Sequence, residues 1–511
     1  MVKAQPVTGN IAHLFLDRRL QDGDAERVAL HLVDGDWTYR EVHAAAEALA
    51  AELRRRGVGR GDRVLIAQPD GAEYVASLFA ILKVGAVVVM LNPRLQEETL
   101  RFLFDQTAAP WALIHPEVEG AFRRAADGAD HHPELLLLGG AAGWPCERPP
   151  EAESTTLAVA ADEPALWLFS GGTTGFPKAV VQPHRSFANT TELYAQRALG
   201  YRRDDVTLAV PKLYFGYATG SALFFPFSVG AATVLFAEHP TAAILFDLIA
   251  RFRPSILINV PTMIGQMLGD PGAGERDLSC LRFATSAGEA LPVPLYERWR
   301  DTFGVELLDG LGTAEMWHVF LSNLPGAVRP GTLGRCVPGF EIKVCNDAGA
   351  EVPAGQVGRL WVRGASRALE YWRNPEKTEQ AFRGDWFIGG DLVCRDDDGY
   401  VTYCGRGDDS LKVGGKWLAP QEVESCLMRH PQVEECAVVG IENAAGLVKP
   451  CAVVRVRSPR PGLEDDLKAH VLAHLEPYKH PRRVVLVEDF PRTHLGKIDR
   501  GALKRSLSQA Q

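Results

Sequence analysis

The sequence predicts an α/β protein: a large N-terminal domain with two parallel-rich sheets and a small β-barrel, then a small α+β C-terminal domain. Strand-length apolar runs alternate with amphipathic helical segments over about the first four hundred residues, which is typical of βαβ units. From residue 331 glycines and turns become frequent, and after residue 405 a tail of about 100 residues is large enough to fold as a unit. We therefore expect domains at residues 1–405 and 406–511.

Helices and strands follow each other closely in the N-terminal region. Residues 39–56 carry Val42, Ala45, Leu49 and Leu53 at helical spacing and end near a glycine, which predicts an amphipathic helix. Short apolar runs bounded by turn residues predict buried strands of largely parallel sheets. The next expected elements are a strand at 63–67, a helix at 73–84, and strands at 86–90, 206–210, 232–236, 255–260 and 282–286.

The pattern changes in the last third of the chain. Closely spaced turns favour short antiparallel strands in a small barrel, with glycines at 339, 349, 355, 358 and 364. Beyond residue 409 a new alternation of helical and strand periods predicts a separate α+β unit. Its expected elements are a helix at 420–429, strands at 434–440 and 451–456, a helix at 463–475 and a strand at 483–487.

Composition excludes several classes of protein. The chain has 511 residues, of which 46% are hydrophobic and 23% charged, as in folded globular proteins and unlike disordered or fibrous ones. Its 55 basic and 64 acidic residues give a net charge of −9. A mildly acidic chain argues against nucleic acid as the main partner, because phosphate binding needs clustered basic residues.

Cysteine usage and the N-terminus suggest the compartment. The nine cysteines contain no C-x-x-C pair, which favours a reducing environment over a disulfide framework or a structural zinc site. Residues 1–10 lack an apolar signal-peptide core. The longest apolar stretch, 75–91, contains Lys83 and Gly85 and resembles a buried helix plus strand more than a membrane span. We expect a cytoplasmic protein without a membrane partner.

The strongest chemical signal is the run Ser170-Gly-Gly-Thr-Thr-Gly-Phe-Pro-Lys178. Small residues let backbone N–H groups converge on an anion, hydroxyls add donors, and lysine adds a mobile positive charge. A Walker A loop would place glycine and lysine side by side before a helix, whereas two residues separate them here. A Gly-rich hairpin turn is the structural alternative, but lysine and paired threonines are not needed to turn a chain. The run therefore predicts anion binding.

This run and later motifs resemble the AMP-forming adenylating enzymes, which include acyl-CoA synthetases, peptide-synthetase adenylation domains and luciferases. The resemblance extends from about residue 25 over nearly the whole chain, with the motifs in the family's order. It implies that the loop wraps the phosphates of ATP and that the C-terminal domain is mobile. The implied phosphate-binding residues are Ser170, Gly171, Gly172, Thr173, Thr174 and Gly175, with Lys178 as a catalytic cation.

Two further motifs are implied to hold the nucleotide and a metal ion. Residues 286–291 resemble the adenine-site segment, with Gly288 and Glu289, although a strand end before a helix would look the same. Residues 309–315 resemble a motif in which a tyrosine stacks on adenine, a threonine meets the α-phosphate and a glutamate holds Mg²⁺. Leu311 and Ala314 replace that tyrosine and threonine, so Thr313 or the backbone must meet the α-phosphate, while Glu315 matches the metal ligand. The resemblance also assigns nucleotide contacts to Asp309, Gly310 and Gly312.

The remaining motifs concern ribose and the moving tail. Residues 386–391 resemble a ribose-binding segment in which Asp391 accepts from both hydroxyls, with Gly389 at a threonine position. In the segment after it, Arg406 would contact ribose and Asp408 would be the hinge, flanked by small residues. Lys497 matches the family's catalytic lysine. The resemblance assigns Gly414 and Gly415 to a tunnel for the thiol, with an ordinary hairpin as the alternative.

These parts imply a two-step ligase that uses ATP, Mg²⁺ and coenzyme A. A carboxylate is a poor acylating agent, so it first attacks the α-phosphorus, forming an acyl-AMP and releasing pyrophosphate. Because both reactants are anions, catalysis consists mainly of positioning and charge stabilisation. The second step needs a thiol and no longer needs Lys497, which a swinging tail would accommodate.

Two segments are similar to the benzoate-CoA ligase branch, residues 213–227 and 315–325. Phe215 would gate the acyl site, and aromatic walls suit a planar ring. The branch carries alanine at the position of Gly216, and loss of that methyl makes room for a ring substituent. We expect a substituted benzoate such as 2-aminobenzoate, with His318 as hydrogen-bond partner. The implied pocket residues are Gly216, Tyr217, Gly312, His318 and Val319, whereas Phe224, Phe225 and Phe227 are expected to be plain core.

Two other functions stay open. An aryl-acid adenylating enzyme that loads a carrier-protein thiol would share the first step. A non-catalytic nucleotide-binding relative gains weight from the departures at Gly171, Ala179, Ala314, Arg359 and Gly389, but the matches at Lys178, Glu315, Asp391, Arg406 and Lys497 oppose it. A homodimer also remains open as the assembly.

Overall fold

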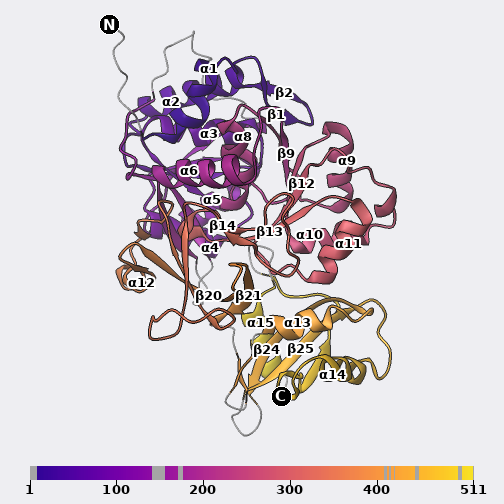
Figure 1. The fold of residues 1–511 in the computed structure, drawn as a ribbon. Helices are drawn as coiled ribbons and strands as arrows, with labels where there is room; N and C mark the ends of the chain where they lie inside the picture. Colours follow the sequence, from indigo (N-terminus) through magenta and orange to yellow (C-terminus); the bar gives the residue numbers. More distant parts are fainter. Residues whose placement is uncertain are drawn as a thin grey trace.

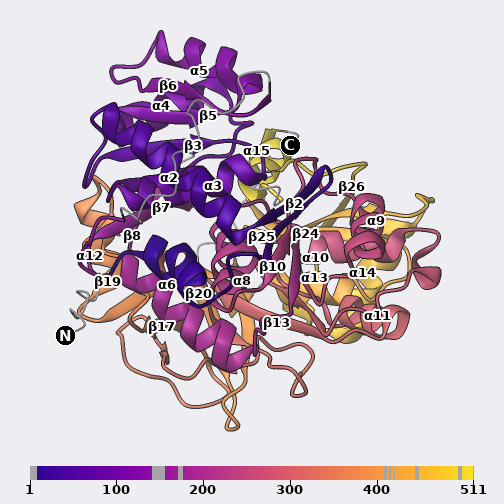
Figure 2. The same ribbon diagram turned by 90° about the horizontal axis from the view of Figure 1, so that it is seen from above.

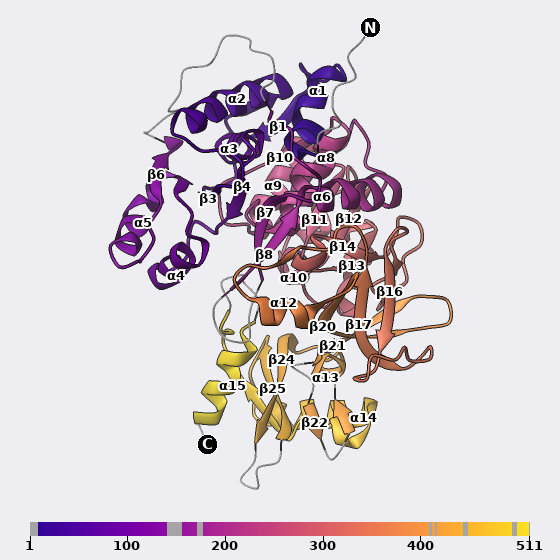
Figure 3. The same ribbon diagram turned by 90° about the vertical axis from the view of Figure 1, so that its left-hand side faces the viewer.

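The computed structural model describes residues 9–140, 156–170, 177–407, 411–413, 416–418, 420–442, 448–492 and 498–509. The elements from η1 (His13–Asp17) to β21 (Val401–Arg406) form the larger part of the molecule. Those from β22 (Leu411–Val413) to α15 (Arg500–Gln509) gather at one end of it (Figure 1, Figure 3).

One large sheet has seven strands and a parallel centre. The pairs β7–β4, β4–β3, β3–β5 and β5–β6 are parallel, and two antiparallel strands extend one edge. The order across the sheet is β18 (Glu370–Tyr371), β8 (Lys178–Pro183), β7 (Pro164–Ser170), β4 (Val87–Met90), β3 (Arg63–Ala67), β5 (Trp111–Ile114) and β6 (Glu134–Leu137).

The second large sheet has nine strands. Its central pairings are parallel, and antiparallel strands close both edges. The order is β15 (Arg335–Cys336), β14 (Val319–Ser322), β13 (Leu307–Gly312), β12 (Phe283–Ser286), β11 (Ile256–Asn259), β9 (Val206–Ala209), β10 (Ala232–Val234), β1 (Val28–Leu32) and β2 (Gly35–Thr38).

Helices cover both faces of each large sheet. Successive residues of a strand point to opposite faces, and both faces of these strands are apolar. In β3, Val64 and Ile66 belong to the central core, whereas Leu65 and Ala67 face an outer core. The central core contains residues of α2 (Tyr39–Arg55), α3 (Ala72–Lys83), α6 (His184–Thr190) and α8 (Phe225–Ser228). The outer cores hold α4 (Glu97–Thr107) and α5 (Glu119–Ala126) on one sheet, and α9 (Ala242–Phe252), α10 (Pro261–Gly269) and α11 (Val293–Phe303) on the other (Figure 2).

An antiparallel sheet follows the two large ones. Its strands are β16 (Glu341–Cys345), β17 (Val357–Arg363), β20 (Trp386–Arg395), β19 (Phe382–Arg383) and β21, and β20 pairs with three of them. The predicted small barrel is therefore present as a half-barrel sheet, beside helix α12 (Pro375–Ala381).

The C-terminal region has its own sheet and cores. Strand β25 (Val448–Val456) lies between antiparallel β24 (Val433–Glu442) and parallel β26 (Arg483–Leu486). Helices α13 (Pro420–Leu427) and α14 (Leu463–His474) share one apolar core with it, and α15 shares another. A short hairpin pairs β22 with β23 (Lys416–Leu418). The expected α/β class and the order of elements are confirmed.

Local differences from the expected pattern are small but informative. The chain contains π-helical segments, η4 (Thr191–Ala198) and η5 (Thr219–Phe224), which the helical spacing does not predict. A π-turn adds about one residue per turn without a clear sequence period, and such turns often occur near functional sites. Phe224, Phe225 and Phe227 are fully buried core residues, as expected.

Candidate active site

Three side chains from distant segments meet next to the predicted phosphate loop. Lys178 Nζ lies 4.7 Å from the centre of the Tyr371 ring. The Tyr371 hydroxyl donates to Glu315 Oε1 at 2.8 Å, and both residues are buried. The structure thus brings the predicted cation Lys178 and the predicted metal ligand Glu315 onto one tyrosine. Tyr371 itself has no recognisable motif around it, so the sequence reasoning missed it.

Strand pairing positions Lys178, and a capped turn positions Glu315. Ser170 and Lys178 are partners in the β7–β8 register, so residues between them connect two paired strands. Glu315 lies in the short turn η7 (Ala314–Met316), whose cap is Thr313, with the Thr313 hydroxyl accepting from Met316 N–H at 3.2 Å. As acceptor in this cap, that hydroxyl keeps its own proton to donate.

The glycines of residues 309–312 have a structural role beside the predicted nucleotide contacts. Strand β13 runs antiparallel to β14, with Gly312 opposite Val319. A Cβ on Gly310 would lie 2.7 Å from Leu321 O, and one on Gly312 would lie 2.5 Å from His318 O. The two backbones therefore approach too closely for any larger residue, while Leu311 between them packs partly buried against the core.

The predicted adenine segment follows β12. Gly288 adopts a φ of 87°, which favours glycine at the turn. The neighbouring Glu289 Oε2 accepts from the N–H and the hydroxyl of Thr262, at 3.1 and 2.7 Å. On β13, burial raises the pKa of Asp309 well above its usual value. Glu289 therefore ties this turn to the start of α10.

The predicted ribose residues lie on neighbouring strands of the half-barrel. Asp391 on β20 is the register partner of Arg406 on β21, and Asp391 Oδ1 lies 3.9 Å from Arg406 Nη1. The Tyr403 hydroxyl donates to the same oxygen at 3.4 Å. Burial and Glu315 raise the pKa of Tyr371, whereas the charge of Arg406 lowers it, so Arg406 also acts on the Lys178–Tyr371–Glu315 group.

The predicted ring pocket contains several residues that the structure links. The hydroxyls of Tyr217 and Thr285 lie 2.6 Å apart. His318 Nε2 lies 3.1 Å from Tyr217 O and 3.1 Å from Ser221 Oγ. A Cβ on Gly216 would lie 3.1 Å from the Leu168 methyls, so Leu168 already occupies the space that a methyl group on Gly216 would need. Val319 is opposite Gly312, and Phe215 precedes the one-turn helix α7 (Gly216–Ala218).

His318 is neutral and keeps one acceptor. Burial lowers the pKa of His318 to about 4. Because a carbonyl only accepts, Nε2 carries the proton that it donates to Tyr217 O. Nδ1 then has a lone pair, and within the described residues it has no hydrogen-bond partner. A buried acceptor without a partner favours a ligand that brings a donor.

Several predicted site residues lie outside the described residues. These are Gly171, Gly172, Thr173, Thr174 and Gly175 of the phosphate loop, the hinge residue Asp408, Gly414 and Gly415 of the thiol tunnel, and Lys497. Their roles stay predictions.

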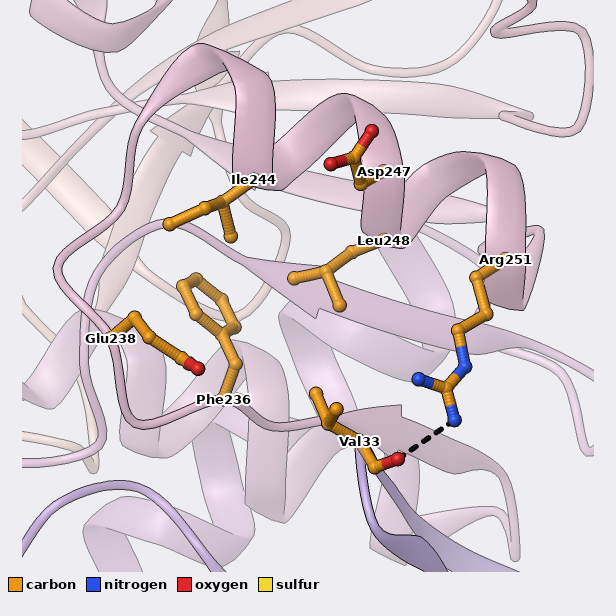
Figure 4. A pocket seen from close by; sticks show the side chains of 7 residues that line it. All are labelled: Val33, Phe236, Glu238, Ile244, Asp247, Leu248 and Arg251. Atoms are coloured by element: carbon orange, nitrogen blue, oxygen red, sulfur yellow. Dashed lines mark hydrogen bonds between the residues drawn. The ribbon is translucent and has the colours of Figure 1, made fainter.

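A surface hollow away from these residues contains none of the predicted site. It is lined by Val33, Phe236, Glu238, Ile244, Asp247, Leu248 and Arg251. Figure 4 shows Arg251 donating to the carbonyl of Val33, at 2.8 Å. This mixed apolar and charged lining brings together no set of reactive groups.

Two observations bear on the setting of the protein. Among the residues that the structure describes, no helix combines the length and apolarity needed to cross a bilayer. The eight cysteines in this described part are free thiols.

Comparison with known proteins identifies the class. The profile of the AMP-binding enzyme family matches residues 17–372, and that of the AMP-binding enzyme C-terminal domain matches residues 422–497. The chain belongs to the AMP-binding enzyme family.

Individual relatives are similar over almost the full length. The benzoate–CoA ligase of Thauera aromatica is 39% identical over 98% of this chain and 96% of its own. The crystal structure of the anthranilate CoA ligase AuaEII in complex with anthranoyl-AMP has a TM-score of 0.93 and 35% identity, covering 99% of this chain and 98% of that one. A benzoate CoA ligase from Burkholderia xenovorans LB400 has a TM-score of 0.89 and 37% identity, covering 97% and 99%.

Proposed function

We propose that this protein activates an aromatic carboxylic acid with ATP to an aryl-AMP and then transfers the aryl group to coenzyme A. The products are the aryl-CoA thioester, pyrophosphate and AMP. The observation that carries this proposal is full-length similarity to benzoate- and anthranilate-CoA ligases, combined with the meeting of Lys178 and Glu315 at Tyr371. We do not favour the carrier-protein alternative, because the relatives named above, which are covered over nearly their full length, are CoA ligases.

In the first step, the chain's own groups gather charge around the α-phosphate. Lys178 supplies a cation at the start of β8, next to the loop of residues 170–175 that we assign to the phosphates. Ser170 Oγ, which has no partner within the described residues, is available to donate there. Preorganised donors and cations of this kind stabilise the charge that develops during transfer.

Glu315 fits the role of the Mg²⁺ ligand. Its carboxylate is buried, and one oxygen already accepts from Tyr371, which fixes its orientation. We assign the other oxygen to the metal, since Mg²⁺ is usually held by one or two carboxylates together with substrate phosphates. When bound there, Mg²⁺ would neutralise the departing pyrophosphate.

The nucleoside end of ATP is held by separate strands. Asp391 and Arg406 are assigned to the ribose, consistent with their pairing across β20 and β21. We assign adenine and the α-phosphate to the turn at Gly288 and Glu289, to the cap residue Thr313 and to the strand residues Asp309, Gly310, Leu311 and Gly312.

We assign the second step to movement of the tail. Residues 406–511 would turn about Asp408, withdrawing Lys497 from the carboxylate and bringing Gly414 and Gly415 to a thiol tunnel. The support is the match of residues 422–497 to a C-terminal domain of its own and the separate cores of this region.

We further propose that the acid is a benzoate with a donor substituent, such as 2-aminobenzoate. The support is the neutral His318, which keeps an unpartnered acceptor within the described residues. An amino or hydroxyl group on the ring supplies the proton that this acceptor lacks. Tyr217, Val319, Gly312 and the gate Phe215 complete the assigned pocket.

A panel of acids tests the activity. The purified protein receives ATP, Mg²⁺ and coenzyme A with benzoate, 2-aminobenzoate, the hydroxybenzoates or a long-chain fatty acid. We expect pyrophosphate release and an aryl-CoA mass with the aromatic acids, highest for a donor-substituted one. Lys497→Ala should abolish adenylate formation while ATP binding survives. An equal response to the fatty acid would contradict the ring pocket, and an aryl-AMP that free coenzyme A never consumes would contradict the thioester step.

A further inference from the structure

A cysteine and two histidines converge between helices α13 and α14 of the C-terminal region. Cys426 lies on α13, and His470 and His474 lie one turn apart on α14. One potential ligand atom of each, the thiol sulfur and a ring nitrogen, lies within 4.8 Å of the other two. Cys426 is buried, His470 is half-buried and His474 is exposed, so the group opens to solvent on one side.

Helix packing holds these residues together. Cys426 and Leu427 of α13 share an apolar core with Leu467 and Val471 of α14. His470 and His474 are four positions apart and lie on one face of α14, and the hydrogen bond of His470 to Cys426 O turns this face toward α13. The shared core of α13 and α14 therefore holds the three side chains of the cluster near one another.

Hydrogen bonds fix the protons of both imidazoles. His470 Nε2 lies 3.1 Å from Cys426 O, and His474 Nδ1 lies 2.8 Å from His470 O. Because carbonyls only accept, these nitrogens carry the protons and donate them. The opposite nitrogens, Nδ1 of His470 and Nε2 of His474, therefore carry lone pairs. Metal-binding histidines usually donate their second N–H to a carbonyl or carboxylate in this way.

A third imidazole in the neighbourhood has a different role. The rings of His430 and His470 have centroids 5.4 Å apart. However, His430 Nδ1 accepts from Gln432 N–H at 3.3 Å, which leaves the proton on Nε2 in the neutral ring. His430 is thus not prepared to bind a metal, and it provides a matched control for the other two.

The other cluster of acids and histidines in the described residues is already filled by a cation. Asp17, His43 and Glu47 also bring their ligand atoms together. Lys83 Nζ donates to Asp17 Oδ1 and, at 2.7 Å, to Glu47 Oε1. Among the described residues, no ammonium group is recorded as a hydrogen-bond donor to the side chains of Cys426, His470 and His474, although the charge of Arg429 acts on Cys426 and His470.

We propose that Cys426, His470 and His474 form a three-ligand site for Zn²⁺, separate from the Mg²⁺ assigned to Glu315. A thiolate with two imidazoles is a donor set that favours zinc over magnesium. Tetrahedral bond lengths place such ligand atoms about 3.3–3.6 Å apart, so the two imidazoles must turn their lone-pair nitrogens toward Cys426 Sγ and approach to that distance. Binding releases the Cys426 thiol proton to solvent, and a water takes the fourth position. The ion would link α13 to α14.

Cobalt titration of the metal-stripped full-length protein, without ATP, tests the site. Co²⁺ replaces Zn²⁺ and gives a near-ultraviolet sulfur-to-metal charge-transfer band. We expect one equivalent to produce this band and Zn²⁺ to abolish it. Cys426→Ser should remove it, and His470→Ala or His474→Ala should weaken binding at least about tenfold. Cys280→Ser and His430→Ala should leave both the band and the affinity unchanged.

A second readout does not depend on the buried cysteine. Zn²⁺ should raise the melting temperature of the wild-type protein and of His430→Ala, but not that of His474→Ala, whose exposed side chain is not needed for packing. The proposal fails if no charge-transfer band appears, if Cys426→Ser keeps the band, or if His430→Ala weakens binding as much as His474→Ala. A zinc-dependent shift that persists in His474→Ala would also overturn it.

Discussion

Tyr371 is the residue that joins the two predicted charges of the site. Its ring lies under the Lys178 ammonium, and its hydroxyl donates to Glu315. A hydrogen bond to a carboxylate holds one oxygen and leaves the other to a metal, while the ring face attracts a cation. Tyr371 is therefore expected to position both Lys178 and Glu315 before ATP arrives.

Replacement of Tyr371 separates these two contributions. Tyr371→Phe removes the hydrogen bond to Glu315 but keeps the ring under Lys178, and loss of a bond to a charged group costs about 1.5–3 kcal/mol. We expect kcat/KM for adenylate formation to fall roughly tenfold or more, with a higher Mg²⁺ requirement. Tyr371→Ala should be slower still, because it also removes the ring. Equal rates for Tyr371→Phe and wild type, measured by pyrophosphate exchange, would show that the hydroxyl has no such role.

Gly216 is the residue that we expect to determine the tolerated ring substituent. In Gly216→Ala the new methyl would lie 3.1 Å from the Leu168 methyls, so the Leu168 side chain must shift, and we expect this shift to narrow the assigned ring pocket. One methyl in such a pocket changes selectivity by roughly tenfold or more. We expect kcat/KM for 2-aminobenzoate to fall by this factor relative to benzoate. Gly265→Ala is the control, since a Cβ there meets nothing within 4 Å. An unchanged ratio would refute this assignment.

At the scale of elements, a buried ionic cluster joins the N-terminal helices. Lys83 at the end of α3 donates to Asp17 of η1, Glu47 of α2 and Thr156. Although burial alone would raise it, hydrogen bonds from His43, Lys83 and Thr156 hold the pKa of Asp17 well below its usual value. Lys83 is fully buried, so water cannot solvate its charge and the charge depends on these partners.

Removal of the central cation should destabilise this region strongly. Lys83→Met leaves Asp17 and Glu47 as buried carboxylates that repel each other, and breaking a buried pair costs about 3–5 kcal/mol. We expect a clearly lower urea midpoint at pH 7. Arg300→Met, which removes an exposed pair with Asp301, should change it by less than about 0.5 kcal/mol. Similar midpoints for the two variants would contradict this account of the cluster.

At the scale of the molecule, buried histidines make stability depend on pH. His184 at the start of α6 accepts from Ile11 N–H through Nδ1 at 3.3 Å, and burial lowers its pKa from 6.5 to about 4. Between these values the unfolded chain binds a proton that the folded chain does not. The free energy of unfolding therefore falls as pH falls through this window. Asp70, whose pKa burial raises to about 6, acts in the opposite direction.

A non-titrating substitution isolates the histidine. His184→Asn keeps an acceptor for Ile11 but takes no proton, so we expect it to lose less stability between pH 7 and pH 5. The difference should be on the order of 2 kcal/mol. Urea unfolding at both pH values measures it, and the Asp70 contribution cancels between the variants. If the wild-type protein and His184→Asn lose the same stability between pH 7 and pH 5, burial does not keep His184 neutral in the folded protein.

The sequence by itself determined the alternation of helices and strands, the distinct composition of the tail and the residues carrying the phosphate, metal and ribose motifs. These are local properties, since helical and strand periods and short motifs lie within a few residues of one another. The tertiary structure alone decided that Tyr371 bonds Glu315 across 56 positions and that His470 bonds Cys426 across 44. Such contacts depend on strand order and helix packing, which bring together residues whose separation in the chain gives no signal.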